Sequence, residues 1–177
     1  ADGTGLASNY SLNSTVINIS QTPVDLSGSK TYDGTTAAID IDITLSNLVG
    51  NETLLHDGNA TLSSANAGSY SISNLSGITI TTGTGDVSNY TLSGGSHNFT
   101  VNPRVINLGG GTRQYDGTTV AIAADLPLTN LVGSETLALS GNAVVENPNV
   151  GVNKELSNIS GLTLVNGTNG GLASNYT

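Results

Sequence analysis

Hydrophobic and polar residues alternate in short runs along this chain, and each run ends at a cluster of turn-forming residues. In the clearest run, residues 38–45, one face of a strand would carry Ile39, Ile41, Ile43 and Leu45. Similar runs cover residues 16–19, 78–80, 97–101 and 162–165. Because such runs recur about every ten residues, the pattern predicts an all-β chain of sandwich or barrel type. No window has a helical period with a start cap, so any helix is expected to be a single turn.

Turn residues divide these runs at defined points. Asp33-Gly34 and Asp116-Gly117 predict tight turns, because Gly accepts the positive φ that such turns require, and we expect each pair to close a β-hairpin. Residues 99–108 are extended on both sides of Pro103. Pro fixes φ and lacks a donor, so this segment is expected to be a stiff joint between two domains.

The same landmarks return once along the chain. Residues 32–36 (Tyr-Asp-Gly-Thr-Thr) recur at 115–119, and Asn-Leu-Val-Gly at 47–50 recurs at 130–133, each 83 residues later. This period is that of a small domain rather than of a solenoid unit. We therefore expect the C-terminal strands of a preceding repeat in residues 1–22, a first repeat in 24–103, and a second repeat, missing its last strands, in 104–177. An alternative frame, based on the Ser-Asn-Tyr motif, is 10–90 and 91–177.

Composition and charge restrict the possible partners. The 177 residues carry a net charge of −9 with only four basic side chains, so a nucleic-acid interface is not expected. No apolar stretch approaches the roughly 18–20 residues of a membrane span. Cysteine is absent. Together with the repeats and the bias toward Asn, Ser, Thr and Gly, this absence favours the outside of a bacterial cell.

Residues 86–90, Asp-Val-Ser-Asn-Tyr, have the form of a tyrosine corner, in which a Tyr hydroxyl bonds to the backbone a few residues upstream. This signal favours an immunoglobulin-like sandwich. The Cys and Trp residues of the immunoglobulin core are absent.

Both copies of the Tyr-Asp-Gly motif, with the Ser-Asn-Tyr motif and the Pro joint, resemble the YDG/MBG repeat domains of large bacterial extracellular proteins. Such repeats occur in filamentous-haemagglutinin-like adhesins, including proteins exported by two-partner secretion. The resemblance covers essentially the whole chain. It implies all-β modules, immunoglobulin-like or β-grasp-like, arranged as an extended rod, with a structural motif made of Tyr32, Asp33, Gly34, Tyr115, Asp116 and Gly117. It implies no catalytic residues.

Chemistry beyond this motif has few candidates. The only histidines, His56 and His97, have no equivalents in the other repeat, so no nucleophilic triad or zinc site is expected. Calcium is the main alternative, because Asp57 and Asp86 lie in loops that contain further oxygen ligands. No Asp-x-Asp-x-Asp-Gly loop is present, and the equivalent of Asp86 is Leu172. We expect no cofactor and no enzymatic activity.

These observations favour a structural role. We expect a stalk or spacer of a cell-surface or secreted bacterial adhesin, whose partners are the neighbouring repeats of its own chain. The alternative is an adhesive module that recognises glycan or a host surface or matrix protein, with calcium as a stabiliser. Aromatic residues are only 4% of the chain, which disfavours sugar stacking.

Overall fold

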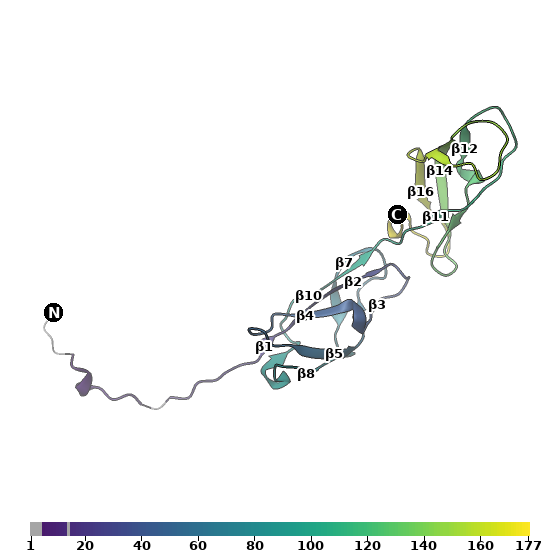
Figure 1. Ribbon diagram of the computed structural model, residues 1–177. Coiled ribbons are helices and arrows are strands. Elements are labelled where there is room, and N and C mark those ends of the chain that lie inside the picture. Colours follow the sequence, from purple (N-terminus) through teal and green to yellow (C-terminus); the bar gives the residue numbers. More distant parts are fainter. Residues whose placement is uncertain (1–4, 14) are drawn as a thin grey trace.

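Two β bodies follow one another along the chain in the computed structural model, which describes residues 5–13 and 15–177 (Figure 1). An extended N-terminal segment leads into the first body, and the second body lies at the opposite end of it. The described residues contain no α-helix, only 3-10 turns of three residues: η1 (Ala7–Asn9), η2 (Asp40–Asp42), η3 (Val87–Asn89), η4 (Ala123–Asp125) and η5 (Ala173–Asn175). Helices are therefore single turns, as the sequence predicted. None of these turns could span a bilayer.

The first body, the first repeat, is built around one mixed sheet. Its strands are β1 (Thr22–Pro23), β2 (Asp25–Thr31), β3 (Ala37–Ala38), β4 (Ile43–Ser46), β5 (Leu54–Gly58), β6 (Ala60–Leu62), β7 (Gly68–Asn74), β8 (Ile78–Thr82), β9 (Tyr90–Thr91) and β10 (His97–Asn102). The six-stranded sheet has the order β3-β6-β7-β10-β2-β4, and with the separate β5–β8 pair it curves into a near-barrel.

Strand β10 holds this sheet together, because it lies between two strands that are distant in sequence. It pairs in parallel with β2, with Phe99 opposite Gly28, and antiparallel with β7, with Phe99 opposite Tyr70. Its alternate residues Phe99 and Val101 are each 1% exposed and belong to the main core cluster. The alternation predicted for residues 97–101 is confirmed.

The second body, the second repeat, follows the same order with fewer strands. They are β11 (Asn107–Leu108), β12 (Val120–Ile122), β13 (Leu128–Thr129), β14 (Leu137–Val145), β15 (Leu156–Asn158) and β16 (Leu162–Asn166). Strand β14 pairs antiparallel with β12, β15 and β16, and β11 pairs with β13. A small core is formed by Ala121, Leu126 and Ala143. The predicted strands at 78–80 and 162–165 are confirmed as β8 and β16.

Two local predictions from the alternation pattern are wrong. Residues 38–45 do not form one strand, because the turn η2 interrupts it and leaves Ile39 and Ile41 exposed. Only Ile43 of the four predicted core residues is fully buried, while Leu45 packs at the edge of the core. Residues 16–19 are extended but belong to no strand, and Ile17 and Ile19 are 85% and 91% exposed.

The hairpin prediction for the Asp-Gly pairs is also wrong. Asp33 and Gly34 connect β2 to β3, which lie at separate positions in the sheet order and do not pair. In the immunoglobulin fold the two sheets are antiparallel, whereas here β10 and β2 are parallel. The chain is thus a pair of tandem β domains with its own strand order.

Candidate functional site at the joint between the repeats

The Tyr-Asp-Gly motif of the first repeat forms a compact turn closed by hydrogen bonds. The Asp33 carboxylate accepts hydrogen bonds from the backbone N–H of Thr35 at 2.8 Å and from its hydroxyl at 2.9 Å. Gly34 has φ of +77°, which is the conformation that the sequence predicted. The Lys30 ammonium lies 2.9 Å from Asp33 and also donates to the backbone carbonyls of Thr35 and Ala37.

The second repeat builds the same turn with an arginine. Thr118 donates to Asp116 from its backbone N–H and its hydroxyl, each at 2.9 Å, and Gly117 has φ of +78°. Arg113 stands 2.6 Å from Asp116 and occupies the place of Lys30. The Asp-Gly turn with a cation three residues before the Asp is therefore a repeated local structure.

The charges in these turns displace the pKa of each carboxyl. For Asp33, burial raises the pKa, but the hydrogen bonds from Lys30 and Thr35 outweigh it and hold the pKa below its usual value. For Asp116, the backbone N–H of Thr118 and then the Arg113 guanidinium lower the pKa to about 2. Both carboxyls are thus ionised at neutral pH and stabilise their turns in that form.

The Tyr32 side chain extends from the first repeat to the second, where its hydroxyl contacts Glu135. Its side chain is 3% exposed, and its hydroxyl donates to Glu135 Oε1 at 2.6 Å. Tyr176 donates to the other oxygen of the same carboxylate, also at 2.6 Å, and accepts from the backbone N–H of Val132 at 3.0 Å. The rings of Tyr32 and Tyr176 meet edge to face, with centroids 5.5 Å apart and planes at 78°. Glu135 therefore links one tyrosine from each repeat.

Burial and the carboxylate both disfavour ionisation of these tyrosines. Burial, followed by the hydrogen bond to Glu135, raises the pKa of Tyr32 to about 12. The same two causes, in the same order, raise the pKa of Tyr176. Both hydroxyls are therefore protonated donors at neutral pH.

Asn175 supplies the second connection across the joint. Its side chain is fully buried, accepts from the backbone N–H of Ala67 at 2.8 Å and donates to Asn66 at 3.0 Å. A buried amide that lost these partners would cost free energy, because its polar groups would be neither hydrogen-bonded nor hydrated. The two bonds therefore stabilise this placement of the second repeat against the loop at residues 66–67.

The covalent connection passes through the same region. After β10 and Pro103, Arg104 forms a parallel bridge with Tyr176, and the backbones exchange hydrogen bonds at Asn175 and Thr177. The Arg104 guanidinium donates to the backbone carbonyl of Asn130 at 2.9 Å and to its side-chain oxygen at 2.7 Å. These bonds anchor the start of the second repeat directly after Pro103, beside the Tyr32 and Asn175 contacts that cross the joint.

Both repeats, each with its Asp-Gly turn, match one protein family. The model of the YDG domain matches residues 15–97 and again residues 102–177. The chain belongs to the YDG domain family. No curated protein and no solved structure matches the chain.

Each YDG repeat contains one tyrosine that bonds to a Glu and to a backbone N–H of the same repeat. In the first repeat, Tyr90 donates to the carboxylate of Glu52 and accepts from the backbone N–H of Val49 at 3.0 Å, as Tyr176 does with Glu135 and Val132. The backbone atom lies 41 residues upstream in sequence, so residues 86–90 do not form the local tyrosine corner that was expected. Asp86 instead caps the turn η3 by accepting from the backbone N–H of Ser88.

The two motif tyrosines occupy different environments. Tyr32 is buried in the joint, whereas Tyr115, its counterpart in the second YDG repeat, is 66% exposed. The sequence therefore identified the motif but not the role of its first residue. The partners Glu135 and Asn175 were missed, although Glu-Thr-Leu at 52–54 and 135–137 and Ser-Asn-Tyr at 88–90 and 174–176 repeat with the motif. These repeated Glu and Tyr residues were the available signal.

The calcium candidates serve the backbone in this structure. Asp57 accepts from the backbone N–H of Gly58 at 2.8 Å, and Asp86 caps η3. Within residues 5–13 and 15–177, no three His, Cys, Asp or Glu side chains cluster in a way that could hold a metal ion. His56 lies 2.5 Å from Asp40, and His97 contacts the carbonyl of Leu92, so both histidines have local structural partners.

Proposed function

We propose that this chain is a load-bearing spacer, part of the stalk of a cell-surface or secreted bacterial adhesin that projects a distal binding region. The observation that carries the proposal is the joint. Tyr32, Glu135, Tyr176 and Asn175 connect the two YDG repeats by contacts that leave little room for rotation about Pro103. Repeat proteins gain stability and stiffness from such nearest-neighbour interfaces.

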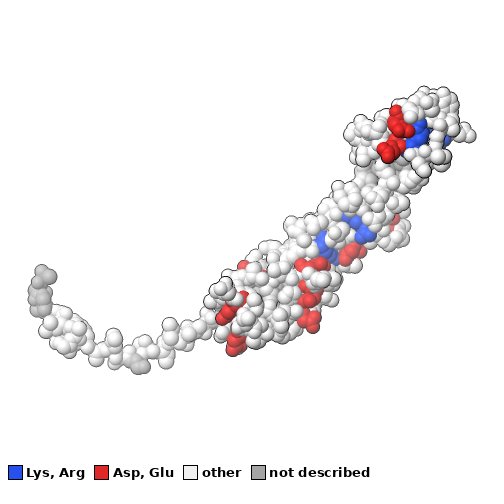
Figure 2. Space-filling model, in the orientation of Figure 1, with Lys and Arg blue, Asp and Glu red and all other residues white. Residues whose placement is uncertain are grey.

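The surface supports the same proposal. The face seen in Figure 2 is mostly uncharged, with acidic side chains more numerous than basic ones. A chain with net charge −9 repels other acidic surfaces, which disfavours nonspecific association with them. We infer an extracellular location and a sandwich-type rod of successive repeats from these features together with the family.

Solution scattering tests the shape that this function requires. A compact globule of this length would have a radius of gyration of about 16 Å. We expect a clearly larger value, with a cross-section of one repeat, at concentrations where the chain is monomeric. The double variant Tyr32→Ala with Asn175→Ala removes both side-chain connections and should broaden the distribution of shapes without unfolding either repeat. A compact wild-type particle would contradict the spacer function.

A display experiment tests the function itself. One, two or three copies of the chain are placed between a cell anchor and a reporter binding domain, with flexible Gly-Ser linkers of equal residue number as controls. Capture of a ligand held at a fixed distance should increase with the number of YDG repeats but not with linker length. Direct binding of the repeats themselves to glycan or a matrix protein would instead support the adhesive alternative.

A further inference from the structure

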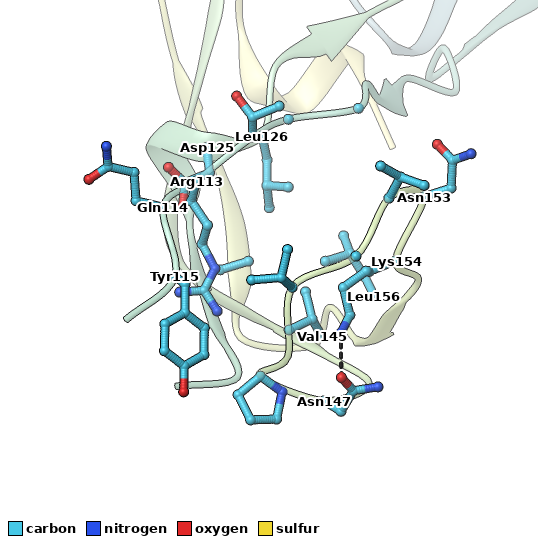
Figure 3. A pocket seen from close by; sticks show the side chains of 18 of the residues that line it. Arg113, Gln114, Tyr115, Asp125, Leu126, Val145, Asn147, Asn153, Lys154 and Leu156 are labelled. Atoms are coloured by element: carbon cyan, nitrogen blue, oxygen red, sulfur yellow. Dashed lines mark hydrogen bonds between the residues drawn. The ribbon is translucent and has the colours of Figure 1, made fainter. Parts of the chain in front are cut away.

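The second repeat contains a groove at the place where the first repeat holds its central strand. The groove has a volume of about 620 Å³ and lies between the segments 108–115 and 145–156 (Figure 3). Arg113, Gln114 and Tyr115 stand on one side of it, and Lys154 and Leu156 on the other. A hydrogen bond from Lys154 to Asn147 closes one end.

The walls of the groove correspond to β2 and β7 of the first repeat. Gly28 of β2 and Gly111 are equivalent, because an added Cβ would meet the backbone oxygen of Asp42 in one case and of Asp125, 83 residues later, in the other. Between β2 and β7 the first repeat places β10. In the described part of the second repeat, no strand pairs with residues 110–114 or 149–155.

The core records the same difference. Leu26, Leu62 and Ile72 are buried in the first repeat beneath Phe99 and Val101. Their counterparts Leu108, Val145 and Leu156 are only partly buried, and they line the groove. The groove is therefore shaped for an extended strand with two apolar side chains on one face.

The N-terminal segment of the chain is such a strand. Thr22 pairs in parallel with Tyr90 as Arg104 pairs with Tyr176, so the two positions are equivalent. Counting back from them, Ile17 and Ile19 stand where Phe99 and Val101 stand in β10. Both isoleucines are almost fully exposed, and residues 15–21 are extended without a strand partner.

We propose that the groove takes up an extended strand with the pattern of residues 15–21, which in an array a neighbouring repeat contributes, so that this inference rests on the spacer function. Between separate copies of this chain, residues 15–21 of one copy would complete the sheet of the second repeat of the next. The segment would run parallel to residues 110–114 and antiparallel to residues 149–155, as β10 does with β2 and β7. Ile17 and Ile19 enter the groove, and Val16, at the position of exposed Asn98, faces solvent.

The joint that results is the one already seen within the chain. Because β10 belongs to the first repeat's sheet, the second repeat that follows it places Glu135 and Tyr176 against Tyr32. As residues 15–21 of a second copy enter the groove, the same geometry brings its Glu52 and Tyr90 to the exposed Tyr115. The donor segment and the groove lie at opposite ends of the molecule, so insertion joins different copies rather than closing on itself (Figure 1). Such heterologous contacts add copies without limit.

Peptide binding tests the groove directly. A fluorescent peptide of residues 15–23 is titrated with the full chain and followed by anisotropy. We expect saturable binding that falls at least about a hundredfold for peptides with Ile17→Asp or Ile19→Asp, because a charge would enter an apolar site. The matched peptide with Val16→Asp should bind nearly as the unchanged peptide does. No binding, or equal loss for all three substitutions, would overturn the proposal.

Cross-linking tests the register in the full chain, which contains no cysteine. Thr100 pairs with Ser29, so Asn18 and Thr112 should meet in the assembly. The variant Asn18→Cys with Thr112→Cys should form covalent ladders of copies on oxidation, whereas Thr15→Cys with Thr112→Cys, three residues out of register, should not. Sedimentation velocity should show concentration-dependent growth that Ile17→Asp abolishes and Tyr115→Phe weakens about tenfold. Ladders from both Cys pairs, or growth unaffected by Ile17→Asp, would refute strand insertion.

Discussion

Replacing Tyr32 by Phe isolates the connection between the repeats, because it removes one hydroxyl and keeps the ring. The hydroxyl lies 2.6 Å from Glu135 Oε1 in a site where Tyr32 is 3% exposed. The edge-to-face contact with Tyr176 should survive. The second repeat offers a matched control, since Tyr115 is followed by the same Asp-Gly-Thr-Thr sequence but is 66% exposed.

The size of the effect follows from the acceptor. Hydrogen bonds to charged groups contribute about 1.5–3 kcal/mol to the free energy of unfolding. Glu135 is only half-buried and keeps its bond to Tyr176, so water can replace part of the lost interaction. We therefore expect a loss of about 1.5 kcal/mol for Tyr32→Phe, which corresponds to roughly 6–12 °C in melting temperature for a domain of this size. For Tyr115→Phe we expect a change within about 0.5 kcal/mol.

Urea and thermal unfolding, followed by circular dichroism at a dilution where the chain is monomeric, measure both variants. The comparison requires that the slope of the free energy with urea stays unchanged, so that the shift in midpoint reports stability. Equal effects of the two substitutions would refute the assignment of Tyr32 to the joint. So would a neutral Tyr32→Phe.

Three further predictions follow from the same contacts. Gly34→Ala and Gly117→Ala should each destabilise the fold by about 1–2 kcal/mol, because both glycines have a positive φ that alanine adopts only with strain. Gly34→Ala should lower the free energy of unfolding in urea by more, because its Cβ would lie 3.0 Å from Val132 across the joint. Equal losses for the two variants would contradict that contact. The free energy of unfolding should fall as pH rises from about 10 to about 12, because folding raises the pKa of Tyr32 to about 12 and the folded state keeps a proton that the unfolded state loses. Tyr32→Phe should flatten this loss. If the variant kept the wild-type pH profile, Tyr32 would not be its cause. Millimolar calcium should raise the melting temperature by much less than the roughly ten degrees expected of a specific site, and no more than magnesium does; a large calcium-selective rise abolished by EDTA would identify Asp57 or Asp86 as true ligands.

Local features of the fold could be predicted from the sequence because they depend on neighbouring residues. The positive φ of Gly34 and Gly117 follows from the Asp-Gly pair, and the alternation of residues 97–101 correctly marks a strand. The run at residues 38–45 failed for a nonlocal reason. The turn η2 brings the carbonyl of Asp42 against Gly28 on β2, a contact that no pattern within the run could reveal.

The site was harder to predict, because each of its contacts joins distant parts of the chain. Tyr32 and Glu135 are 103 residues apart in sequence, and Asn175 contacts a loop 108 residues upstream. The repeated motif showed which residues recur, but it treated Tyr32 and Tyr115 as equals. Their environments differ because a second repeat packs on the first one only.

This difference shows that the structural unit of the array is the joint as well as the repeat. In the joint, the first repeat supplies Tyr32 and the strands β2 and β7. The sequence that follows supplies β10, which pairs with both strands, and then Glu135 and Tyr176. A repeat inside an array therefore completes its own core only when the next segment inserts its strand. Stability should then rise with each added neighbour, as in other linear repeat proteins, and be lowest for the repeat whose groove is open. Phe99 and Val101 therefore pack in the core of the first repeat, although in sequence they lie in β10, the strand that leads into the second repeat. A domain boundary at Pro103 divides the sequence into two repeats, but each core also needs the strand that connects it to the next repeat.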